Sequence, residues 1–182
     1  KLTENTVNSE ELIIFIVRII GSLPVLFFPF WGSILAILVD LSDLFLIGFI
    51  KMGGVSNYQK LDKFLDLFYM SLFLIVSLRW DSREKFISIG LFAFRMLGVT
   101  LFFIFNIRII LVFFPNVFEF WFVLITGYKY FNQNKSILPS VIFKILLIAF
   151  VLKLSHEIFI HHIKILDNYT AIEFLDMIFQ RG

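Results

Sequence analysis

Residues 40–66 read DLSDLFLIGFIKMGGVSNYQKLDKFLD, a stretch that places four acids in an otherwise apolar setting. The acids are Asp40, Asp43, Asp62 and Asp66. The first two are spaced i,i+3 and the last two i,i+4, so each pair lies on one face of a helix. The glycines at 53–54 let the chain turn back between the pairs. We therefore expect two antiparallel neighbouring helices with acids that face each other.

The composition indicates a membrane protein. The 182 residues are 59% hydrophobic with a mean hydropathy of +0.92, and they include 26 Phe and no Cys. A soluble domain is about 45–50% apolar. The net charge is only +2 and no long basic run occurs, which argues against nucleic acid as a partner. Without cysteine, neither a disulfide framework nor a thiolate metal site can form.

Six apolar stretches approach the length of about 20 residues that a membrane-spanning helix needs. They are residues 12–30, 31–50, 58–78, 86–105, 109–128 and 138–160. We expect a tight turn near residues 29–32 and a charged surface loop at 79–85. Residues 169–180 have the near-helical spacing of an amphipathic helix at the membrane surface.

The predicted fold is an all-α integral membrane bundle of six transmembrane helices with a short C-terminal amphipathic helix, built as a single domain over residues 1–182. The N-terminus lacks the basic region and small-residue cleavage site of a signal peptide, so we expect the first helix to be retained. This predicts a multi-pass protein of the cell membrane. Basic residues are almost equally divided between the two sides, so charge does not fix the orientation.

Four carboxylates brought close together need a countercharge to remain ionised. Mg²⁺ or Mn²⁺ would supply it, because hard cations prefer oxygen ligands and suit sites that also hold phosphate. Such a cluster can clamp a phosphoryl group, and a carboxylate can deprotonate an attacking hydroxyl. The alternative is that the acids pair with Lys51, Lys60 and Lys63 or with arginines inside the membrane.

The spacing Asp40-x2-Asp43, eighteen residues, Asp62-x3-Asp66 resembles the CDP-alcohol phosphotransferases, membrane enzymes of phospholipid synthesis. Their signature, D-x2-D-G-x2-A-R-x8-G-x3-D-x3-D, lies on the second and third of six transmembrane helices. The resemblance covers residues 18–66, about a quarter of the chain. Arg18 is similar to an arginine commonly found in the first helix of that family.

The resemblance implies that Asp40, Asp43 and Asp62 are metal ligands and that Asp66 joins them and activates the acceptor alcohol as a base. The sequence departs from the signature at the positions that serve the nucleotide. Leu44 replaces a glycine, residues 47–48 replace the Ala-Arg pair, and the second interval is one residue longer. The resemblance therefore implies a metal site more directly than a cytidine site.

Further charged residues lie within the later apolar stretches. Arg95 and Glu119 fall inside predicted helices, and Arg108 and Asn116 flank the break that Pro115 imposes. Arg18, Arg95 and Arg108 are candidates for binding the phosphates of a substrate, because guanidinium groups bind phosphate through paired hydrogen bonds. The alternative for Arg95 is a buried pairing with an aspartate or with Glu119.

Residues 153–164, KLSHEIFIHHIK, contain all three histidines of the chain, His156, His161 and His162. Their spacing is not that of the zinc motif H-E-x-x-H, and His156 and His161 point to different helix faces. We interpret them as polar residues at the place where the last helix leaves the membrane, in preference to a metal site.

These patterns lead to three functional hypotheses. The first is a divergent metal-dependent transferase that acts on a phosphate-containing lipid precursor, with membrane lipid as its surroundings. The second is a non-catalytic subunit or scaffold of a larger membrane complex, which includes a homodimer. The third is an ion or proton pathway that uses Asp40, Arg95 and Glu119 as relay groups.

Overall fold

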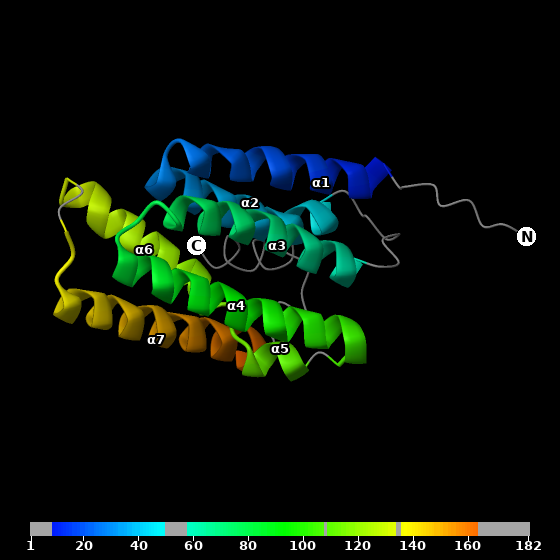
Figure 1. Cartoon of the computed structure of the whole chain (residues 1–182). Coiled ribbons are helices and arrows are strands. Elements are labelled where there is room, and N and C mark those ends of the chain that lie inside the picture. The colour runs from blue at the N-terminus through cyan, green and yellow to red at the C-terminus, as the bar shows by residue number, and fades with distance from the viewer. Residues whose placement is uncertain (1–8, 50–57, 108, 134–135, 164–182) are drawn as a thin grey trace, which may run out of the picture.

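The computed structural model describes residues 9–49, 58–107, 109–133 and 136–163, and the side chains of residues 12–42, 63–107, 109–133 and 136–156. Across the described residues the chain is all-helical, as predicted (Figure 1). The elements are α1 Ser9–Ser22, the 3₁₀ helix η1 Leu23–Leu26, α2 Pro29–Phe49, α3 Tyr58–Ser77, α4 Ser82–Phe105, α5 Ile109–Phe113, α6 Val117–Phe131 and α7 Pro139–Ile163. The predicted amphipathic segment 169–180 lies outside the described residues.

The helix boundaries differ from the sequence-based expectation at two turns. The first turn falls at residues 27–28, and Pro29 begins α2. Proline suits the first position of a helix because its φ is already helical and it lacks an N–H that would be unpaired there. The expected loop 79–85 is shorter than predicted, because α4 begins at Ser82 and takes Asp81 as its N-cap residue.

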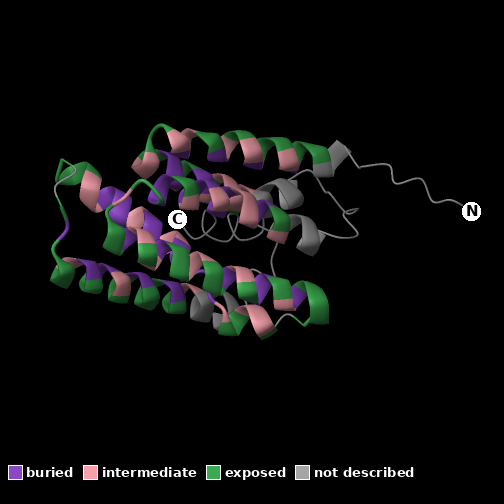
Figure 2. Ribbon diagram, viewed as in Figure 1, coloured by how far each residue is buried: buried purple, intermediate pink, exposed green. Residues whose placement is uncertain are grey.

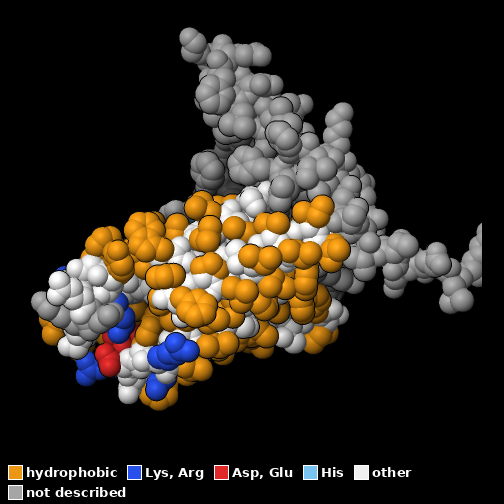
Figure 3. Space-filling view, turned by 90° about the horizontal axis from the view of Figure 1, so that it is seen from above, with side chains coloured by type: hydrophobic (Ala, Val, Ile, Leu, Met, Phe, Trp, Pro, Cys, Tyr) orange, Lys and Arg blue, Asp and Glu red, His pale blue; other side chains and the backbone are white. Residues whose placement is uncertain are grey.

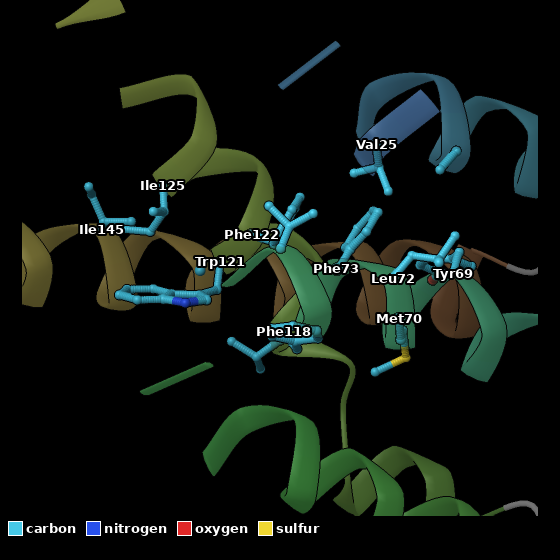
Figure 4. Close-up of a cluster of buried hydrophobic side chains, with 14 of the residues drawn as sticks. Val25, Tyr69, Met70, Leu72, Phe73, Phe118, Trp121, Phe122, Ile125 and Ile145 are labelled. Atoms are coloured by element: carbon cyan, nitrogen blue, oxygen red, sulfur yellow. The ribbon is translucent and has the colours of Figure 1, made fainter. Parts of the chain in front are cut away.

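The helices lie side by side in a bundle, with α3 and α6 at its centre (Figure 1). Helix α3 packs against α1, α2, α4 and α6, and α6 also packs against α2, α4 and α7. The aromatic side chains of these two helices fill the core (Figure 4). The rings of Phe73 and Phe122 stack with their centroids 4.2 Å apart, and Trp121 is fully buried. This core fixes the central helices against each other.

Many large apolar side chains lie on the outer surface of the bundle. Phe27, Phe113 and Phe143 are each at least 67% exposed, and exposed residues follow much of α7 (Figure 2). Hydrophobic side chains cover most of the face in Figure 3. Large apolar surfaces of this kind mark contact with a membrane or a partner.

Three of the described helical stretches are long and apolar enough to cross a membrane, judged by length and composition. They are Ser82–Phe105, Ile109–Phe131 and Pro139–His156. Shorter apolar helices cover Leu12–Leu26 and Pro29–Ser42. These helices are compatible with a membrane protein.

Candidate functional site

A buried arginine connects the first three helices. Arg18 of α1 is 3% exposed and forms ion pairs with Asp40 of α2 and Asp66 of α3. Its Nη2 donates a hydrogen bond to Oδ1 of Asp66 at 2.8 Å. One guanidinium therefore neutralises carboxylates from two different helices, both of which belong to the four-acid pattern of the sequence.

A second cation holds the other oxygen of Asp66. Nζ of Lys63 donates to Oδ2 of Asp66 at 2.9 Å, three residues away on the same helix. Asp66 is only 7% exposed, and both of its carboxylate oxygens have charged partners within the bundle. This arrangement meets the requirement that a buried charge be paired and hydrogen-bonded.

Close packing of α1 on α2 brings Arg18 to Asp40. A Cβ added at Gly21 would lie 2.7 Å from Cγ2 of Val39, so a larger residue would require the Val39 side chain or the helices to shift. Gly21 lies one turn after Arg18, and Val39 directly precedes Asp40. The glycine therefore allows the approach that the ion pair needs.

A second polar cluster lies between α3 and α6. Nδ2 of Asn116 donates to Oε2 of Glu119 at 3.1 Å and to Oη of Tyr69 at 3.3 Å, and Tyr69 donates to the same carboxylate oxygen at 3.4 Å. Tyr69 and Asn116 are at most 4% exposed. Since Tyr69 follows Asp66 by one turn of α3, the cluster adjoins the Arg18 ion pairs.

Two further cations act on Glu119 from neighbouring helices. Lys153 of α7 and Arg95 of α4 both attract its carboxylate, and Asp66 repels it. Lys153 is 7% exposed, and its Nζ lies 3.5 Å from Nδ1 of His156. The two polar clusters thus form one electrostatic neighbourhood in the middle of the bundle, with side chains from α1, α2, α3, α4, α6 and α7.

Arg95 also donates a hydrogen bond to the backbone at the helix break that Pro115 causes. Its Nη1 donates to the carbonyl oxygen of Phe114 at 2.7 Å. That carbonyl lies between α5 and α6, outside the hydrogen bonding of either helix. Gly98, one turn after Arg95, lets Phe114 lie against α4, because a Cβ at position 98 would overlap the Phe114 side chain.

The structure places the sequence-predicted residues as follows. Arg18, Asp40 and Asp66 meet, and Arg95 lies close enough to act electrostatically on Asp66. The described hydrogen bond of Arg95 goes to the backbone carbonyl of Phe114. The alternative drawn from the sequence was a pairing with an aspartate or with Glu119. The backbones of Asp43 and Asp62 are helical, one turn from Asp40 and Asp66 respectively. The side chains of Asp43, Asp62, His161 and His162, and the whole of Arg108, lie outside the described residues.

The donor chemistry of the cluster suits a hard cation. Asp40 and Asp66 offer carboxylate oxygens from adjacent helices, the donor type that Mg²⁺ and Mn²⁺ prefer. Among the described residues, no three His, Cys, Asp or Glu side chains are grouped closely enough to hold a metal ion. Asp43 and Asp62 are the remaining candidate ligands, so a complete metal site would require them to join Asp40 and Asp66.

Sequence reasoning did not identify Tyr69 or Lys153 as site residues. Tyr69 resembles the other aromatic residues of the chain, and its role depends on a hydrogen bond to a residue 50 positions away. Lys153 did carry a signal, because a lysine within an apolar helix is costly and usually has a partner. Its proximity to Glu119 became visible only in the folded chain.

The fold and the site define an all-α protein with long apolar helices and a buried cluster of paired charges. Comparison of the chain with models of protein families, with curated proteins and with solved structures found no match.

Proposed function

We propose that the chain is a six-span membrane enzyme, a divergent metal-dependent transferase that acts on a phosphate-containing lipid precursor and resembles the CDP-alcohol phosphotransferases. The six spans are α1 with η1, α2, α3, α4, α5 with α6, and α7. The observation that carries the proposal is the pairing of Asp40 and Asp66 with the same arginine. The first and last acids of the motif are thereby drawn to one place.

In this proposal Asp40, Asp43, Asp62 and Asp66 hold Mg²⁺ or Mn²⁺. The bound metal would neutralise charge on the phosphoryl group that is transferred. Asp66 accepts the proton of the acceptor alcohol, whose oxygen forms a bond to phosphorus as the bond to the leaving phosphate breaks. Asp66 is therefore the proposed catalytic base.

The arginines bind the substrate phosphates. Arg18 exchanges its carboxylate partners for phosphate oxygens, and Arg95 and Arg108 are the other candidate phosphate-binding residues. This exchange keeps each buried charge paired before and after substrate binding. It also explains why an arginine, which cannot lose its charge, lies between two acids that a metal would need.

The test uses protein purified in nanodiscs and measures Mn²⁺ binding by electron paramagnetic resonance, together with transfer from a panel of CDP-alcohols. Asp43→Asn is expected to weaken Mn²⁺ binding about tenfold, equivalent to about 1.4 kcal/mol, and to abolish transfer. Asp81→Asn, at the exposed N-cap of α4, is the matched control and should leave both unchanged. A wild-type protein that binds neither Mg²⁺ nor Mn²⁺, and an Asp43→Asn variant that behaves identically, would exclude the enzyme.

The hydrogen-bonded group of Tyr69, Asn116 and Glu119 favours a second candidate function, a proton or ion pathway through Asp40, Arg95 and Glu119. Its support is the electrostatic contact of Glu119 with both Asp66 and Lys153 across the bundle. Ionisable groups inside a membrane commonly mark such paths. Proteoliposomes loaded with a pH-sensitive dye should then lose flux with Glu119→Gln or Asp40→Asn but retain it with Asp81→Asn. Equal flux in all four proteins would remove this candidate.

A further inference from the structure

A cavity of about 330 Å³ lies at the end of the bundle where the turn between η1 and α2, the turn after α3 and the end of α6 come together. Aromatic rings form most of its wall. The rings are those of Phe27, Phe28, Phe30, Trp31, Trp80 and Tyr130. We call this cavity the aromatic pocket. Lys129 supplies the positive charge in the wall of this pocket.

The aromatic rings pack against one another, and several of them are exposed at the mouth of the pocket. Phe30 stacks on Tyr130 with centroids 5.5 Å apart, and Trp31 meets Tyr130 edge-on at 6.1 Å. Phe27, Trp31 and Tyr130 are each more than half exposed. Tryptophan and tyrosine gather where a membrane meets water, because their rings are apolar and one edge is polar.

Lys129 is fixed within this wall. Its Nζ lies 3.8 Å from Oε1 of Glu84 and 5.8 Å from the centre of the Trp80 ring. Glu84 is 1% exposed and lies in the interior, whereas Lys129 is 15% exposed and lines the pocket. An ammonium group has three N–H donors, and a single carboxylate does not use them all.

The same end of the bundle is basic. Arg79, Arg83, Lys85 and Lys129 are its basic residues, against Asp81 and Glu84, which leaves a net charge of +2 for these six described residues. Figure 3 shows basic side chains gathered at this end, beside the hydrophobic face. An anion is therefore favoured here over a cation.

We propose that the aromatic pocket binds the head group of an anionic phospholipid. Nζ of Lys129 donates to a phosphate oxygen, and the acyl chains lie along the exposed aromatic residues toward the apolar surface of the bundle. The location supports a lipid, because in the proposed membrane-spanning arrangement an end of the apolar helices is the level at which head groups lie. The pocket is separate from the proposed transferase site, since the eleven helical steps of α3 from Asp66 to Ser77 correspond to about 16 Å.

The test measures lipid retention by native mass spectrometry after reconstitution in equal amounts of phosphatidylglycerol and phosphatidylcholine. The wild type should retain phosphatidylglycerol with about fivefold preference, the factor expected from one basic group at the membrane surface. The double variant Glu84→Gln, Lys129→Gln removes both charges and leaves no carboxylate unpaired. It should lose the preference.

Trp31→Ala provides a second test that does not depend on the buried pair. Trp31 is 56% exposed, so its removal should reduce phosphatidylglycerol retention without unfolding the bundle. Phe105→Ala, an equally exposed aromatic at the far end of α4, is the matched control and should have no effect. Equal retention of both lipids by the wild type, or an unchanged preference in Trp31→Ala and the double variant, would overturn the proposal.

Discussion

Arg18 of α1 donates a 2.8 Å hydrogen bond to Asp66 of α3, across 48 residues of sequence, while it pairs with Asp40 of α2. Arg18 and Asp66 are buried, at 3% and 7% exposed, so their contact forms inside the bundle, whereas the Asp40 side chain is 24% exposed. The guanidinium therefore joins three helices and determines where two acids of the motif lie.

Removal of this arginine should destabilise the protein strongly. Arg18→Met leaves Asp40 without its described partner and Asp66 with Lys63, and a broken buried ion pair typically costs about 3–5 kcal/mol. Thermal unfolding in detergent, followed by circular dichroism, would measure the loss. A triple variant that also carries Asp40→Asn and Asp66→Asn should recover much of it, because neither aspartate position then carries a negative charge that lacks the arginine. A triple variant as unstable as Arg18→Met would contradict this account.

Gly98 should be intolerant of any side chain. A Cβ at position 98 would overlap Phe114, so Gly98→Ala is expected to cost about 1–3 kcal/mol through overpacking. Gly90 on the same helix is the matched control, because a Cβ there meets no atom within 4 Å. Gly90→Ala should be neutral or stabilising by up to about 1 kcal/mol. Equal unfolding temperatures for the two variants would show that α5 and α6 do not depend on this contact.

The hydrogen bond from Arg95 to the carbonyl of Phe114 should contribute to the same interface. Arg95→Met leaves that carbonyl unsatisfied in an apolar setting, at a cost of about 1–3 kcal/mol. Because Gly98 contacts the same residue, the double variant with Gly98→Ala should lose less stability than the two single losses combined. Strict additivity in a double-mutant cycle, measured by thermal unfolding, would mean that the two sites are independent.

A buried polar contact also joins α4 to α6. Nε1 of Trp121 donates to Oγ of Ser88 at 2.9 Å, and both residues are fully buried. Ser88→Ala should cost about 1–3 kcal/mol, because the indole N–H loses its acceptor. Ser71→Ala is the control, since Ser71 donates only to the carbonyl of Leu67 on its own helix among the described contacts. If Ser88→Ala and Ser71→Ala unfold at the same temperature, the indole bond contributes nothing to stability.

The sequence predicted the helices better than the site. Apolar length located the helical segments, and Pro115 marked the break between α5 and α6. The helical periodicity of Asp40 and Asp66 indicated that the acids could face a neighbour. Their pairing with Arg18 was open, because lysines nearby and arginines farther away were equally available partners. Lys63 and Arg18 both proved to be partners of Asp66.

The sequence alone determined an all-α chain with apolar helices that are compatible with a membrane, because hydrophobic length and helix-breaking residues act locally along the chain. Only the tertiary structure decided which buried charges meet. Arg18 reaches Asp40 because Gly21 lets α1 lie close to Val39 of α2, and Tyr69 reaches Glu119 because α3 and α6 pack around a shared aromatic core. A buried charge must be paired, and helical spacing along the chain indicates only the partners on its own helix, such as Lys63 for Asp66, whereas partners on other helices are decided by packing.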